Sequence, residues 1–205
     1  MNGTLINYTY LYCGGRPEDG AGRGITHVKV KDGVKYIEDN AFWGWEDLIS
    51  IHIPSSVIRI GDKAFCNCES LVSIRIPDSV QDIGEYVFNE CHNLSDVKLS
   101  NSLTRITACT FRHCSSITRF TIPPSVTTIE QLCWNVCTSL LQLNIPSSVT
   151  KIGNSACDGC FSLRSIRLPY GIQTIQNLAF YRCKSLESIQ IPQSAQSIDY
   201  GVFGR

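Results

Sequence analysis

The sequence has one methionine and four histidines, and it carries no excess of charge of either sign. Its 205 residues include 18 Lys and Arg against 18 Asp and Glu, so the formal net charge at pH 7 is zero with His counted as neutral. This balance argues against a generally basic nucleic-acid-binding protein and an acidic disordered chain. With only four His residues, few are available for metal binding or for catalysis by histidine. With 43% hydrophobic residues, the chain can still bury a core.

Long hydrophobic runs are absent as well. The apolar runs span only a few residues, so insertion into a membrane is not expected. The first residues, MNGTLINYTYLYCGG, lack the basic and apolar segments of a secretory signal. This absence, together with the many unpaired cysteines, favours the cytoplasm. A cell-surface or secreted location stays open as the alternative, because nominal N-glycosylation sequons begin at Asn2, Asn7 and Asn93.

A repeat dominates the sequence from residue 25 onward, and its step is twenty-three residues, the interval from Pro54 to Pro77. Its clearest marker is a row of prolines at this constant step, with Ser100 at the one position where the proline is missing. The prolines are Pro54, Pro77, Pro123, Pro146, Pro169 and Pro192. Each closes a phrase L-x-x-I-x-I-P, which is followed by V-x-x-I-G and by A-F-x-x-C. Eight units therefore tile residues 25–205, the last one truncated, and residues 1–24 form an N-terminal extension or cap.

The pattern inside one unit predicts its local structure. I-x-I-P alternates with period two and is rich in β-branched residues, which is typical of a short strand that ends at the proline. V-x-x-I-G predicts a second short extended segment, and the stretch before A-F-x-x-C predicts a single turn of α or 3₁₀ helix. No unit can bury its own apolar columns, so stacked units must bury them together. The expected fold is an α/β-type repeat solenoid of mostly short parallel strands.

The residue pattern of the repeat unit also resembles that of a known family. Units two and three read LISIHIPSSVIRIGDKAFCNCES and LVSIRIPDSVQDIGEYVFNECHN. They resemble the BspA-like, Treponema-type leucine-rich repeats, and the resemblance covers residues 25–205. It implies the right-handed superhelix of leucine-rich repeats and a binding scaffold rather than an enzyme. Repeats of this kind occur in bacterial surface adhesins and in protist surface proteins.

Six of the eleven cysteines fall in one column of the repeat. They are Cys68, Cys91, Cys114, Cys137, Cys160 and Cys183. We interpret them as a buried stack of small hydrophobic side chains, with S–H groups that can contact the backbone. Disulfides along the stack are disfavoured, because the Cβ vectors of stacked units run parallel. A zinc-binding structural protein is a second alternative, with Cys133, Cys137, Cys157 and Cys160 as ligands, but core substitution explains these four without a metal and no cofactor is expected.

No arrangement of residues points to an enzyme. His113 and Cys114 are neighbours, yet the Cys belongs to the core column and the His should point away from it. Phosphate-binding loops of the G-x-x-x-x-G-K type and H-E-x-x-H zinc motifs are absent. The protein is therefore expected to be non-catalytic.

The residues that flank the middle Ile of I-x-I should point away from the core. Over the eight units these positions hold five Lys or Arg against one Asp, a net charge of +4 before His. Candidate partner-binding residues among them are His27, Lys29, His52, Arg75, Asp96, Lys98, Arg119, Asn144 and Arg167. Because the whole chain is neutral, the turns and the opposite face must hold the balancing acid.

This basic stripe predicts an interaction scaffold that binds a protein partner, in particular an acidic one, through the strand-lined face. The alternative is a cell-surface adhesion module that binds a host or matrix protein or a polyanionic glycan. Aromatic residues are missing from both outward columns, so specific nucleic-acid binding is not expected. In the competing interpretation these polar residues bind no partner. They keep the exposed strands soluble and protect the strand edges.

The two ends of the repeat lead to separate expectations. The last unit stops in mid-motif after Phe203, which leaves a strand edge and apolar surface open. We expect either a fragment of a longer array or end-to-end self-association. At the other end, Leu5, Ile6, Tyr8, Tyr10 and Leu11 predict a strand that covers the first unit.

Overall fold

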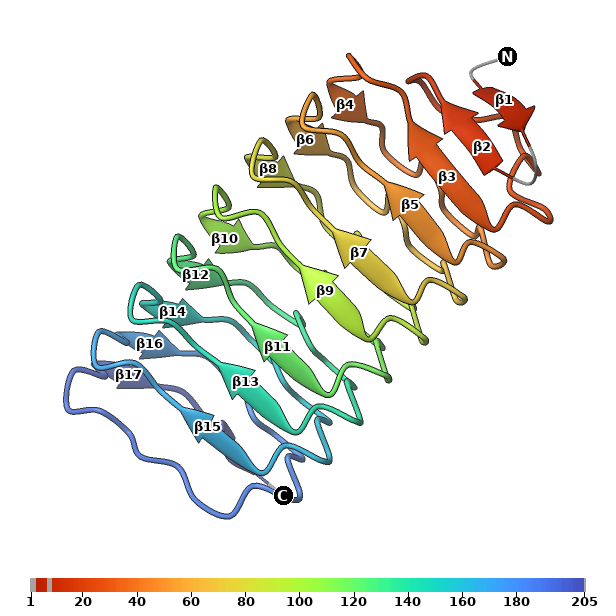
Figure 1. Cartoon of the computed structure of the whole chain (residues 1–205). Coiled ribbons are helices and arrows are strands. Elements are labelled where there is room, and N and C mark those ends of the chain that lie inside the picture. Colours follow the sequence, from red (N-terminus) through yellow and green to blue (C-terminus); the bar gives the residue numbers. More distant parts are fainter. Residues whose placement is uncertain (1–2, 7–8, 205) are drawn as a thin grey trace.

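In the computed structural model, which describes residues 3–6 and 9–204, the chain forms one row of stacked coils (Figure 1). A typical coil has a three-residue strand on one side, a two-residue strand on the next and a series of turns on the third. We call these sides the strand face, the second face and the turn side. The sequons at Asn2 and Asn7 and the expected strand residue Tyr8 lie outside the described residues.

The I-x-I-P segments form the strand face. Its strands are β3 (His27–Val30), β5 (Ser50–His52), β7 (Ser73–Arg75), β9 (Asp96–Lys98), β11 (Arg119–Thr121), β13 (Gln142–Asn144) and β15 (Ser165–Arg167). Where they pair with one another they are parallel, and inward side chains alternate with outward ones, as the pleat requires. After the strand the chain turns, and the amide of Val57 donates to the carbonyl of Pro54 at 3.1 Å.

The V-x-x-I segments form the second face. Its strands are β4 (Tyr36–Ile37), β6 (Arg59–Ile60), β8 (Asp82–Ile83), β10 (Arg105–Ile106), β12 (Thr128–Ile129), β14 (Lys151–Ile152), β16 (Thr174–Ile175) and β17 (Ser197–Ile198). The Ile of each strand is buried except Ile198 of β17. The coils pass so close after these strands that a Cβ on Gly153 would lie 2.6 Å from the carbonyl carbon of Glu130, so glycine is needed there.

A hairpin precedes the repeat. Strand β1 (Gly3–Ile6) is antiparallel to β2 (Thr9–Tyr12), and β2 is parallel to β3 of the first coil. Tyr10 meets Trp45 edge-on with 5.1 Å between ring centroids, and Tyr12 packs on Phe42 at 5.0 Å. Burial raises the pKa of Tyr12 to about 12, so its hydroxyl stays protonated while it accepts the amide of Glu38 at 3.3 Å. The hairpin therefore covers the apolar end of the first coil.

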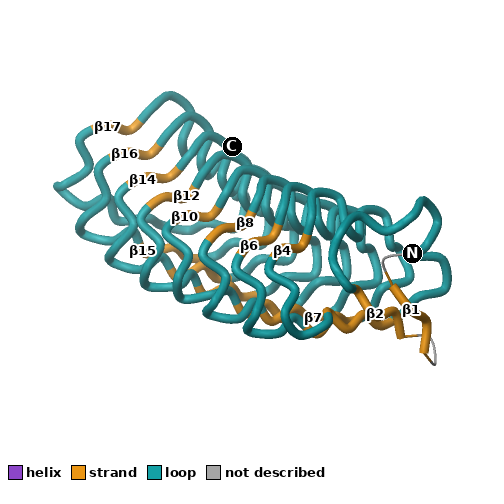
Figure 2. Tube along the Cα trace, turned by 90° about the horizontal axis from the view of Figure 1, so that it is seen from above, coloured by secondary structure: helices purple, strands orange, loops and turns teal. Residues whose placement is uncertain are grey.

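The turn side contains no helix in the described part of the chain, so the α/β class and the expected turn of α or 3₁₀ helix are not confirmed (Figure 2). Its backbone amides alternate between two kinds of acceptor. The amide of Phe65 donates to Val87 of the next coil at 3.0 Å, whereas that of Cys66 donates back to Lys63 at 3.1 Å. A helix would use every amide inside one segment, and the bonds between coils on this side would be lost. The fold is therefore a β-solenoid. None of the described residues forms a helix that could span a membrane.

Aromatic rings form the centre of the core. Phe42, Phe65 and Phe88 stack nearly parallel at 5.3 and 5.5 Å, and the stack continues through Phe111 to Trp134. Cys157 takes the next position, as the sequence indicates, and a second stack joins Phe180 to Phe203 at 5.9 Å.

The backbone ladders are interrupted at three coil boundaries. On the strand face the order of paired strands breaks between β5 and β7 and between β9 and β11. On the second face it breaks between β8 and β10. The buried core continues across all three boundaries.

Candidate interaction surface on the strand face

The candidate residues of the basic stripe all lie exposed on strands of one face. They are His27 and Lys29 on β3, His52 on β5, Arg75 on β7, Asp96 and Lys98 on β9, Arg119 on β11, Asn144 on β13 and Arg167 on β15. The buried residue between each outward pair, such as Val28 or Ile74, fixes the direction in which the flanking side chains point.

The strand register aligns these residues in two columns. Lys29 lies beside His52, and Arg75 lies beside Lys98, in the same column. Further along this column Asn144 lies beside Arg167. The other column holds His27, Asp96 and Arg119. Since neighbouring strands are about 4.8 Å apart, side chains from adjacent coils can contact one ligand together.

The one acidic member of the stripe is engaged by one of the basic members. Arg75 donates to both carboxylate oxygens of Asp96, and the Nη1–Oδ1 distance is 2.9 Å. Hydrogen bonds from Arg75 lower the pKa of Asp96, and the same bonds raise the pKa of Arg75. Sequence reasoning missed this pair because it compared residues at the same repeat position, whereas Arg75 and Asp96 are diagonal neighbours.

A shallow depression lies over the N-terminal half of the stripe. Its volume is about 800 Å³, and its rim carries Lys29, His52, Arg75 and Lys98. Asp78 is the only carboxylate among its described lining residues. His27 lines it too, so this half of the stripe combines a concave shape with five basic or imidazole side chains from four successive coils.

A second depression of about 1100 Å³ lies at the C-terminal end of the strand face. Arg167 lines it together with Tyr170 and Ile191, whose side chains are 78% and 44% exposed. Tyr170 was not among the residues expected from the sequence. The signal that could have found it is an aromatic residue directly after Pro169, where most units place a small or acidic residue.

The cysteine column is buried in the core. Each of its thiols donates to a backbone carbonyl of the preceding coil, for example from Cys114 to Phe88 at 3.1 Å and from Cys160 to Trp134 at 3.0 Å. Burial raises the pKa of Cys114, so this thiol keeps the proton that it donates. All eleven cysteines are free.

The zinc alternative finds no ligand set in the structure. The pKa of Cys157 is raised well above its usual range, mainly by a hydrogen bond with Cys160 and also by burial. A cysteine that binds zinc must lose its proton, so this environment does not favour a zinc ligand. The thiols of Cys133 and Cys137 also donate to backbone carbonyls. Within residues 3–6 and 9–204, no three His, Cys, Asp or Glu side chains are grouped so that they could hold a metal ion.

Comparison with known proteins gives these repeats a family. The sequence model of the BspA type leucine rich repeat region matches residues 21–141 and 127–205. The chain belongs to the BspA-type leucine-rich repeat family. Leucine-rich repeat proteins are generally non-enzymatic scaffolds for protein interaction.

Solved structures of leucine-rich repeat proteins are similar to this fold. The T. pallidum leucine rich repeat protein TpLRR is 25% identical with a TM-score of 0.61, and the match covers 93% of this chain and 79% of that one. The pneumococcal vaccine antigen PcpA is 19% identical with a TM-score of 0.55, over 92% of this chain and 55% of that one. No curated protein matches the sequence.

Proposed function

We propose that this BspA-type chain is a non-catalytic scaffold that binds an acidic protein through its strand face. The observation that carries the proposal is the column Lys29, His52, Arg75 and Lys98, whose four side chains from four successive coils line one depression. Such a row attracts and orients a partner with an extended run of carboxylates, because complementary charge speeds association and fixes register.

The strand face also has the composition of a reversible binding surface. Its outward residues are polar and mostly exposed, and the described strands of this face present no exposed aromatic ring. The Arg75–Asp96 pair is solvent-exposed, so a partner carboxylate can compete for Arg75 at small cost. Adhesion to a polyanionic glycan on a cell surface would use the same column and is an outcome of the test below.

The test replaces four basic residues of the stripe in one variant, Arg75→Ser, Lys98→Ser, Arg119→Ser and Arg167→Ser. The matched control, Arg23→Ser, Lys35→Ser, Lys151→Ser and Lys184→Ser, removes the same charge from exposed residues that lie outside the two columns. Binding of a labelled decapeptide of Asp and Glu is measured at low salt. We expect the stripe variant to bind about tenfold or more weakly and the control to bind as the wild type does.

Equal binding by both variants would overturn the proposal, whether both retain affinity or both lose it. Retention by the stripe variant would show that the basic residues of the stripe are not the site, and equal loss would show that only net charge matters. Heparin is the second probe. Tighter stripe-dependent binding of heparin than of the peptide would favour the glycan-binding alternative over the acidic protein.

A further inference from the structure

The coil of residues 94–116, which we call the rocker coil, is joined to its neighbours on opposite sides. On the strand face its strand β9 pairs with β7 of the preceding coil, and the ladder to β11 of the following coil is broken. On the second face its strand β10 pairs with β12 of the following coil, and the ladder to β8 is broken. The rocker coil is thus joined by a backbone ladder to the preceding coil on one face and to the following coil on the other.

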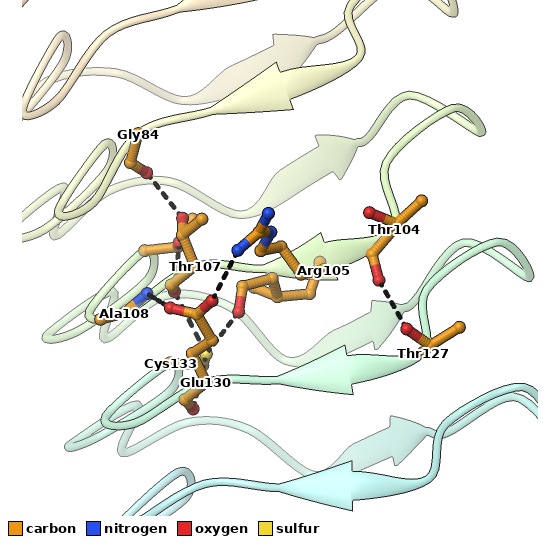
Figure 3. A network of polar contacts seen from close by, with 10 residues as sticks. Gly84, Thr104, Arg105, Thr107, Ala108, Thr127, Glu130 and Cys133 are labelled. Carbon is orange, nitrogen blue, oxygen red and sulfur yellow. Dashed lines mark hydrogen bonds and ion pairs between the residues drawn. The ribbon is translucent and has the colours of Figure 1, made fainter.

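The break on the second face is a gap in the backbone hydrogen bonds. At the next boundary the amide of Thr127 donates to Thr104 at 2.9 Å and that of Glu130 to Ile106 at 2.9 Å. Among the described residues, no backbone hydrogen bond joins 81–84 to 103–107. Instead the hydroxyl of Thr107 donates to the carbonyl of Gly84 at 2.6 Å (Figure 3). A cleft of about 250 Å³ lies beside it, lined by residues 81–83 and 103–105.

Departures from the repeat fall at these two breaks. The rocker coil has Ser100 where most units have proline, and Leu103 where most have valine. Thr107 stands at the position of Gly84 and Gly153, and its hydroxyl bonds to the carbonyl of Gly84 across this boundary. At the other break, Phe120 replaces the usual aliphatic residue and packs on Phe111 of the rocker coil with 4.8 Å between ring centroids.

Two charged residues of the rocker coil each pair with one neighbouring coil, and the coil on the other side holds a residue of opposite charge at the same repeat position. Asp96 pairs with Arg75 of the preceding coil, yet Arg119 occupies the equivalent position of the following coil, in the same column on the other side. Arg105 pairs with Glu130 of the following coil at 3.7 Å, yet Asp82 occupies the equivalent position of the preceding coil, across the cleft.

The two charged residues that line the cleft, Asp82 and Arg105, pair with other coils and not with each other. Asp82 pairs with Arg59 at 3.6 Å on its far side, and all four second-face residues of these two pairs are at least partly exposed. Exposed ion pairs exchange partners at little cost, so each of these charges can change sides.

We propose that the rocker coil tilts between two arrangements. One is the structure described, with Asp96 on Arg75 and Arg105 on Glu130. In the other, Asp96 pairs with Arg119 and Arg105 pairs with Asp82, which closes the cleft between β8 and β10 and opens the ladder between β7 and β9. The turn side is the pivot, because the amide of Tyr86 donates to Ala108 at 3.0 Å and that of Cys109 to Gln131 at 3.0 Å, so its ladder is continuous through the rocker coil.

The tilt would let partner binding at the strand face change the position of the rocker coil. A partner carboxylate that takes Arg75 displaces Asp96, which releases the rocker coil toward the closed-cleft arrangement. This consequence rests on the proposed function, whereas the tilt itself does not.

Amide hydrogen exchange measured by NMR tests the tilt. In the wild type we expect the amides of Thr104 and Thr107 to exchange about tenfold or more faster than that of Thr127, whose ladder bond is made. Glu130→Gln removes the present partner of Arg105 and leaves the strand face untouched. It is expected to slow exchange at Thr104 and Thr107 several-fold and to speed exchange of the Ile76 amide, which donates to Lys98 at 2.8 Å.

The matched control is Glu130→Gln combined with Asp82→Asn, which also removes the alternative partner and should return the wild-type exchange pattern. Equal protection of Thr104, Thr107 and Thr127 in the wild type would overturn the proposal. So would identical exchange in Glu130→Gln and in the double variant. A cooperative thermal transition close to that of the wild type checks that both variants are folded.

The acidic decapeptide separates this inference from the proposed function. If the peptide binds and slows exchange at Thr104 and Thr107, binding at the strand face shifts the rocker coil toward the closed-cleft arrangement. If it binds without this effect, the response is wrong. If it does not bind, the proposed function fails, and the comparison of Glu130→Gln with its double variant still decides the tilt.

Discussion

Single thiols in the core act as hydrogen-bond donors that tie one coil to the coil before it. The Cys68 thiol donates to Phe42 at 3.2 Å and the Cys137 thiol to Phe111 at 3.0 Å, a span of 26 residues in each case. A thiolate could not donate, and burial raises the pKa of Cys68 and of Cys137 well above the usual range. The thiols of this column are therefore structural and unreactive.

This burial predicts a simple labelling pattern. Cys13 is exposed and the other ten cysteines are buried. Ellman's reagent at pH 8 should modify one thiol rapidly in the native protein and the rest only after unfolding, because the thiolate is the reactive form. Cys13→Ser should abolish the rapid phase. Rapid modification of several thiols in that variant would contradict the buried column.

Much of the residue-level arrangement could be predicted from the sequence. The column from Cys68 to Cys183 was expected to be buried with S–H groups near the backbone, and a column shared by successive units can only be a stack. The Arg75–Asp96 pair could not be predicted in this way, because it depends on which of several exposed rotamers a long side chain takes.

At the scale of the coil, the turn side requires backbone conformations that most residues avoid. Two positions in almost every coil have positive φ, and one of them is occupied in successive coils by Gly44, Asn67, Glu90, His113 and Val136. Glycine and asparagine tolerate φ near +60°, whereas a β-branched residue is strained there. Val136, with φ of 59°, is thus the least suited residue of this column.

Val136→Asn is expected to raise the free energy of unfolding by about 1 kcal/mol, because it relieves this strain. Asn67 already occupies the equivalent position with φ of 60°. Val72→Asn is the control, since Val72 is 45% exposed and is not among the residues with positive φ. Urea denaturation measures both variants. A gain in Val72→Asn as large as in Val136→Asn would show that added polarity, and not φ, is responsible.

The strands could be predicted from sequence and the turns could not. I-x-I has the period of two that predicts the short strand found at Ser50–His52, and the glycine that follows V-x-x-I indicates the extended segment found at Arg59–Ile60. The spacing of Phe65 and Cys68 fits one helical turn equally well. What decides against a helix is the alternate use of amides for bonds between coils, which no single unit of the sequence reveals.

At the scale of the whole molecule, zero net charge conceals an uneven distribution. The stripe holds five of the 18 basic residues, whereas Asp62, Glu85 and Glu90 lie on the turn side or next to it. Uneven charge gives a neutral protein a face that attracts ions of one sign.

The neutral molecule is therefore expected to be retained on a sulfonate cation exchanger at pH 7 and low salt. The stripe variant and its matched control have the same net charge, yet the stripe variant should elute at clearly lower salt. Coelution of the two would show that the basic residues do not act as one surface.

The constant step of the coils also restricts how the chain can change in length. Each buried column, such as Ile37, Ile60 and Ile83, is in register with its neighbours because no residue is gained or lost between units. Loss of one residue inside a strand would turn every later side chain of that coil to the opposite side of the sheet. Loss of one whole unit would leave every column intact. Duplication and deletion in whole units are thus the natural route by which such a protein lengthens or shortens during evolution.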